Sequence, residues 1–186
     1  MKEITQALKN QALILGSMVA TMWLVMIADT FVFHHRLQTF GIFPHSLVGL
    51  RGIIFAPLLH ANFNHLISNT VPFVTLGWLI MLWETSDLLV VTIISMLVGG
   101  LGTWLFGGAN TVHVGASGVI FGYLGYLLFR GYFERKVSSI IMSLFVFGAY
   151  GSVVFGILPG MPGISWQGHL FGFIGGAIAA KLAAKK

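Results

Sequence analysis

The chain has 186 residues, of which 56% are hydrophobic and only 8% are charged. Soluble domains carry about 25% charged residues, so this composition excludes a water-soluble globular protein and predicts an integral membrane protein. The net charge of +5 does not indicate nucleic-acid binding, because the basic residues are scattered near the ends of apolar segments. The chain contains no cysteine, which excludes disulfide bonds.

Apolar runs separated by polar breaks predict an all-α bundle of six transmembrane helices, forming a single domain over residues 1–186. A spanning helix needs about 20 apolar residues. The predicted spans are 12–32, 61–82, 88–106, 115–131, 137–156 and 167–183. The first span is not followed by a small-residue cleavage pattern, so we expect it to be a retained anchor and not a cleaved signal.

The connection between the first two spans is too long to be a simple loop. Residues 34–60 are largely apolar, yet they contain Pro44, Pro57 and several glycines. Irregular backbone is tolerated at membrane depth only where protein buries it. We therefore expect a re-entrant or interfacial structure in this first outer loop.

The basic residues predict the orientation. An even number of spans places both termini on one side of the membrane. That side carries eight of the ten basic residues: Lys2, Lys9, Arg130, Arg135, Lys136, Lys181, Lys185 and Lys186. The opposite side carries only Arg36 and Arg51. Because lysine and arginine are enriched in cytoplasmic loops, we expect cytoplasmic termini and outward-facing connections at 34–60, 107–115 and 158–166.

Polar groups inside a membrane are costly and indicate function by default. The first cluster is "HANFNHLISN" (60–69), in which His65 and Asn69 are four residues apart and share a helix face. Hydrogen bonding between helices is an equally good explanation for this pair alone. A metal site at His60 and His65 is not favoured, because residues five apart do not share a face and no carboxylate accompanies them.

The second cluster surrounds Ser117, which lies between Ala116 and Gly118 in "GASG" (115–118). Gly118 and Gly122 have the GxxxG spacing that lets another helix approach closely, and serine itself is common at such contacts. Gly115 and Gly118 also leave the backbone open beside Ser117. If a helix begins here, its free N–H groups form a natural anion site.

The third cluster is His169, which precedes Gly172, Gly175 and Gly176 in the last span. A lone membrane histidine is usually structural. This one lies on a glycine face at the same depth as Ser117, so we expect the two side chains to meet as nucleophile and base. Asn69, His65 and the Ser117 N–H would stabilise an oxyanion. No acidic residue lies near, which predicts a dyad and not a triad.

Three segments resemble the motifs of the rhomboid intramembrane serine proteases: "GASG", "GHLFGFIGG" (168–176) and the His/His/Asn pattern of 60–69. Their order, spacing and span number match, and the resemblance covers about 12–183. It implies that Ser117 is the nucleophile, His169 the general base, and His65 and Asn69 oxyanion donors, while His60 has a supporting role. The small six-span type is prokaryotic, so we expect a bacterial inner membrane.

Two positions depart from the family pattern. The first outer loop often carries Trp-Arg, but here only Arg51 is present, within "GLRG". Some members have a tyrosine four residues after the serine, stacked on the histidine, and here that residue is Phe121. Its ring can still stack, but no hydroxyl is available.

The resemblance implies cleavage of single-span membrane proteins near the outer end of their transmembrane segment, within the lipid bilayer and without cofactor, metal or nucleic acid. His113, Asn110 and Gln167 are expected to line an outward water cavity. Residues 137–156 are a candidate gate and 157–166 a candidate cap. The alternatives are a catalytically inactive rhomboid-like protein that binds membrane clients and a small transporter. The chain has neither the HExxH of zinc intramembrane proteases nor the paired membrane acids of aspartyl ones.

Overall fold

The computed structural model describes residues 2–160 and 163–185, and its regular elements in these ranges are all helical. The long helices are α1 (Lys2–Phe31), α3 (Phe63–Met81), α4 (Thr85–Phe106), α5 (Ser117–Glu134), α6 (Val137–Tyr150) and α7 (Trp166–Ala183). Short helical turns form the rest: η1 (Arg36–Phe40), η2 (Val48–Arg51), α2 (Gly52–Phe55), η3 (Ala56–Leu58) and η4 (Gly151–Ile157). By length and composition, α1, α4 and the continuous α6–η4 segment can cross a membrane. The chain is a helical membrane protein.

Each predicted span overlaps one long helix, and two boundaries differ from the prediction by more than three residues. Helix α1 begins at Lys2 and not near residue 12, because residues 2–11 contain no glycine or proline and are rich in good helix formers. The α-helix expected over 137–156 ends at Tyr150 and continues as the 3₁₀ segment η4. Glycines at 148, 151 and 156 weaken helix propensity there.

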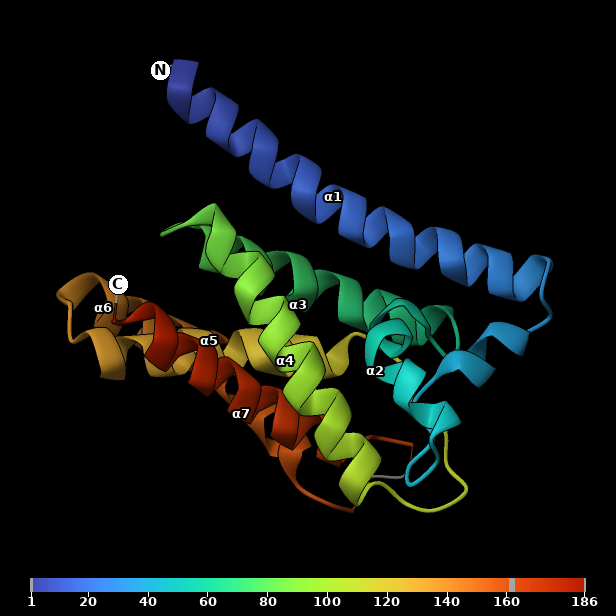
Figure 1. The fold of residues 1–186 in the computed structure, drawn as a ribbon. Helices are drawn as coiled ribbons and strands as arrows, with labels where there is room; N and C mark the ends of the chain where they lie inside the picture. The colour runs from blue at the N-terminus through green and yellow to red at the C-terminus, as the bar shows by residue number, and fades with distance from the viewer. Residues whose placement is uncertain (1, 161–162, 186) are drawn as a thin grey trace.

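Helix α5 lies at the centre of the bundle. It packs most extensively on α7 and also contacts α3, α4 and α6, whereas α1 packs mainly on α3. Figure 1 shows α1 running along the outside, with both termini and the α3–α4 and α5–α6 connections at one end. The long connection between α1 and α3 lies at the other end, together with the loop after α4. Below, these are called the inner and outer ends of the bundle.

The contact between α5 and α7 is made by glycine faces. A Cβ atom added at Gly172 would collide with the carbonyl group of Gly118, and one at Gly176 would collide with the carbonyl of Gly122. The two backbones therefore touch without intervening side chains, which is the close approach expected from the small-residue spacing. This contact sets the separation of the side chains at the outer ends of both helices.

The outer connection of residues 32–62 is folded against the bundle. Its short turns pack closely, since a Cβ atom at Gly49 would lie 2.7 Å from the backbone nitrogen of Phe43. The Arg51 guanidinium lies over the Phe40 ring, 4.3 Å from its centroid, and donates to the Thr39 carbonyl at 2.9 Å. An isolated antiparallel bridge joins Ile42 to His113 in the loop after α4. The connection thus supports the loop that precedes α5.

The inner end of the bundle is held by a buried charge network. Arg130 of α5 donates to Asp87 of α4 at 2.8 Å and to Glu134 one turn later at 2.7 Å. Tyr126 donates to the same Asp87 carboxylate at 2.7 Å, and Ser139 of α6 hydrogen-bonds to Glu134. These hydrogen bonds join α4, α5 and α6 at the end opposite to Ser117.

Candidate active site

Ser117 occupies the first residue of α5. The chain enters the helix through Gly115, whose φ of +121° is a conformation that residues with a side chain rarely adopt. A Cβ atom at Gly115 would also lie 2.6 Å from the His65 ring. Gly115 is therefore required here both by its backbone conformation and by the close approach of α3. Ser117 is left half-buried at the outer end of α5, with the unpaired N–H groups of the first helical turn around it.

His169 lies in the first turn of α7 and faces Ser117. The distance between His169 Nε2 and Ser117 Oγ is 2.9 Å, which is a hydrogen bond. On the other side of the ring, Nδ1 lies 2.9 Å from the carbonyl oxygen of Gly156. The ring of Phe121 stacks on the imidazole with centroids 4.1 Å apart and planes 8° from parallel. Contacts from two other elements, α5 and η4, therefore fix the position of this histidine.

The His65 and Asn69 side chains of α3 lie beside Gly115, two residues before Ser117. The Asn69 amide nitrogen is buried and has no hydrogen-bond partner among the described residues. It would lie 3.6 Å from a Cβ atom placed at Gly115, close to the backbone that leads into Ser117. A buried N–H donor without a partner is costly, so this amide is available to an oxygen atom bound beside Ser117.

His60 packs behind these donors. Its ring meets that of His65 edge to face, with centroids 5.1 Å apart, and its Nε2 accepts from the Ala116 N–H at 3.5 Å. Burial, and to a lesser extent the charge of His65, lowers the pKa of His60 to about 4. His60 is thus a neutral acceptor for the backbone of the turn before Ser117.

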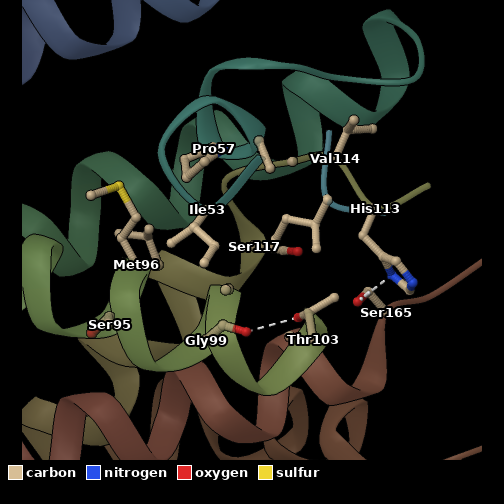
Figure 2. A pocket seen from close by; sticks show the side chains of 17 residues that line it. Ile53, Pro57, Ser95, Met96, Gly99, Thr103, His113, Val114, Ser117 and Ser165 are labelled. Atoms are coloured by element: carbon tan, nitrogen blue, oxygen red, sulfur yellow. Dashed lines mark hydrogen bonds between the residues drawn. The ribbon is translucent and has the colours of Figure 1, made fainter. Parts of the chain in front are cut away.

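A cavity of about 40 Å³ opens directly behind Ser117. Figure 2 shows its apolar wall, made by Ile53, Pro57 and Met96, facing a polar wall from α4 and the outer loops. The polar wall contains Ser95, Thr103, His113 and Ser165. The cavity is large enough for a water molecule or a small side chain.

His113 is the best-connected polar group at this cavity. Its Nδ1 hydrogen-bonds to Ser165 at 2.7 Å, and its Nε2 to Thr111 at 2.8 Å. Burial lowers the pKa of His113, which favours the neutral ring. His113 also lines the cavity, as predicted. Asn110 and Gln167 do not, since Asn110 is exposed and Gln167 donates to the Phe106 carbonyl at 3.2 Å.

Several lining groups were not anticipated from the sequence. Thr103 donates to the carbonyl of Gly99 one turn earlier, and Ser165 immediately precedes α7. Ser165 lies four residues before His169, a spacing that could have indicated a shared side of the helix entrance. The predicted cap, residues 157–166, contains positions 161 and 162, which lie outside the described residues.

None of the carboxylates in the described residues hydrogen-bonds to His169. Asp29 accepts from the Leu37 N–H at 2.8 Å, and Asp87 and Glu134 belong to the network at the inner end. The described residues also contain no cluster of three or more His, Asp or Glu side chains able to hold a metal ion. The arrangement can activate a serine hydroxyl with an imidazole and offer N–H donors to the resulting oxyanion.

Comparison with known proteins places this chain in a family. The model of the Rhomboid domain matches residues 47–186. The chain is 42% identical over 191 residues to the "Uncharacterized protein Rv1337" of Mycobacterium tuberculosis, an alignment that covers 96% of this chain and 79% of the relative. It is 33% identical over 135 residues to the Bacillus subtilis protein named "Putative rhomboid protease YdcA", covering 69% of this chain and 65% of that one. The chain belongs to the rhomboid family.

Proposed function

We propose that this chain is an intramembrane serine endopeptidase that works through a Ser117–His169 dyad. The observation that carries the proposal is the 2.9 Å hydrogen bond between Ser117 Oγ and His169 Nε2. In the first step, His169 Nε2 takes the hydroxyl proton as Ser117 Oγ attacks the scissile carbonyl. The Ser117 N–H, His65 and the Asn69 amide donate to the oxyanion. His169 then protonates the leaving amine, and water cleaves the acyl-enzyme with the same base.

The chain's architecture supports a topology of six spans with cytoplasmic termini in a bacterial inner membrane. The six long helices alternate in direction, and most basic residues lie at the inner end, where lysine and arginine are expected to face the cytoplasm. Ser117 and His169 then lie just inside the outer surface. The outer connection over residues 32–62 would lie at the interface, with the exposed apolar side chains of Val48, Ile54 and Phe55 toward lipid.

We propose single-span membrane proteins as substrates, cut near the outer end of the transmembrane segment. A helical segment has its carbonyl groups hydrogen-bonded, so helix-weakening residues such as glycine or proline should favour cleavage. The small cavity behind Ser117 favours a small side chain beside the cleaved bond. Its polar wall would hold the water that the second half of the reaction requires.

The test is cleavage of a generic single-span substrate by the chain reconstituted in phospholipid vesicles. Ser117→Ala and His169→Ala should each abolish cleavage while the helical circular dichroism and thermal midpoint stay close to those of the parent. Ser17→Ala and His34→Ala are matched controls, because Ser17 bonds only within α1 and His34 is exposed in the outer connection. A fluorophosphonate should label the parent but not Ser117→Ala. Full cleavage by either dyad variant would reject the mechanism.

A further inference from the structure

The imidazole of His169 is held on the side away from Ser117 by a backbone group. The carbonyl oxygen of Gly156, in η4, lies 2.9 Å from His169 Nδ1. A carbonyl oxygen can only accept, so Nδ1 must carry the proton when this hydrogen bond forms. Nε2 then presents its lone pair to the Ser117 hydroxyl, which is the arrangement that a general base requires.

In a serine protease triad, a buried carboxylate performs this task. Here no described carboxylate hydrogen-bonds to His169, and its two ring nitrogens hydrogen-bond to Ser117 and Gly156. The Phe121 ring stacks on the face of the imidazole and restricts its tilt, but it cannot select a tautomer. The selection of the tautomer is therefore left to the Gly156 carbonyl.

The absence of a side chain at position 156 is necessary for this contact. A Cβ atom there would lie 2.8 Å from Cζ of Phe121 and 3.4 Å from Nδ1 of His169. The first distance is shorter than real Cβ contacts, so a larger residue would push η4 away from the Phe121–His169 stack. Gly151, in the same segment, has no such constraint, because the nearest atoms to its added Cβ are 3.4 Å away.

We propose that the Gly156 carbonyl is the positioning group of the dyad, fixing His169 as the Nδ1–H tautomer with Nε2 toward Ser117. This inference rests on the proposed function. A carbonyl takes the place of the aspartate found in a triad, without adding a charge to the membrane interior. In soluble serine proteases, loss of the correct tautomer lowers kcat by about 10⁴-fold. A weakened acceptor should have a smaller effect.

The direct test replaces one backbone amide by an ester. Incorporating the α-hydroxy acid analogue of isoleucine at position 157 turns the Gly156 carbonyl into an ester carbonyl, which is a weaker acceptor. The same exchange at position 154 weakens the Val153 carbonyl and is the matched control within η4. We expect about a tenfold lower kcat with unchanged KM at position 157, and parental kinetics for the control.

A spectroscopic readout separates positioning from a merely structural role. Solid-state ¹⁵N NMR of histidine-labelled protein in vesicles distinguishes a protonated Nδ1 from a protonated Nε2. The parent should show His169 as the Nδ1–H tautomer, and the ester at 157 should increase the Nε2–H population. Gly156→Ala should shift the tautomer in the same direction, whereas Gly151→Ala should not.

Failure of this inference can be distinguished from failure of the proposed function. A parent in which His169 is the Nε2–H tautomer, or a 157 ester with parental tautomer or parental kcat, would overturn the role of Gly156. The tautomer measurement needs no substrate. Cleavage that survives in Ser117→Ala or His169→Ala would instead refute the proposed dyad itself, so the two failures are distinguishable.

Discussion

The contact between α5 and α7 can be tested by adding a single methyl group. Gly172→Ala places a Cβ atom 2.8 Å from the carbonyl carbon of Gly118, and still closer to its oxygen. Neither neighbour is a flexible side chain, so the clash can be relieved only if the two helices separate. Because Ser117 and His169 lie at the outer ends of these helices, their separation must follow.

The expected magnitude follows from these distances. Ordinary contact begins near 3.4 Å, so the carbonyl carbon must move away by at least about 0.6 Å, and its oxygen by more. Added to the 2.9 Å between Ser117 Oγ and His169 Nε2, this gives at least about 3.5 Å, which is too long for a good hydrogen bond. Misplacing reacting groups on this scale costs about 100-fold in rate, and overpacking costs about 1–3 kcal/mol in the free energy of unfolding.

The assay is the initial rate of substrate cleavage in vesicles, together with the thermal midpoint in detergent micelles. Gly16→Ala in α1 is the control, because nothing lies within 4 Å of its added Cβ. It should leave both quantities close to parental values. If Gly172→Ala cleaves as fast as Gly16→Ala, the backbone contact between α5 and α7 does not set the geometry of the dyad.

Three further predictions concern other parts of the molecule. Tyr150→Phe removes the 2.6 Å hydrogen bond to Thr75 that joins α6 to α3. It should lower the free energy of unfolding by about 1 kcal/mol and raise the cleavage rate if α6 is the gate, whereas an unchanged rate would argue against that gate. Asp87→Ala leaves Arg130 without its 2.8 Å partner and should cost about 3–5 kcal/mol in unfolding free energy, so a thermal midpoint equal to that of the parent would contradict a buried network. The pKa of His60 is lowered from 6.5 to about 4, so the unfolded chain binds a proton in that range that the folded chain does not. Stability should therefore be complete above about pH 6.5 and fall by about 3 kcal/mol as the pH drops toward 4, and thermal midpoints of His60→Gln should show a flatter pH profile.

Much of the site could be predicted because polar residues are so costly in a membrane. Ser117, His169, His65 and Asn69 are exceptions to an apolar background, and glycines spaced along two segments indicated which helices would touch. Each of these features is carried by residue type and spacing alone. The helical positions followed from the same hydrophobic pattern, apart from the start of α1 and the change to 3₁₀ geometry after Tyr150.

The remaining parts of the site depend on tertiary structure. Gly156 is one of 24 glycines, and its contribution is a backbone carbonyl that every residue possesses. Thr103, in α4, and Ser165, just before α7, reach the cavity from segments that are distant in sequence. Asn110 and Gln167 were equally polar and near the same loops, but their side chains point elsewhere. No residue type or spacing marks Thr103 or the Gly156 carbonyl before the chain is folded.

The buried network around Arg130 has a consequence for motion along the helix axes. At one end, α5 is held to α4 by the Arg130–Asp87 ion pair and to α6 by the hydrogen bond from Ser139 to Glu134. At the other end, it is held to α7 by touching backbones. Because α5 is held at both ends, it cannot shift along its axis or rotate about it without breaking one of these contacts. In α6 and η4, by contrast, only Ser139 and Val146 are buried. Any widening of the bundle would therefore occur more easily at α6 than at α5, which carries Ser117.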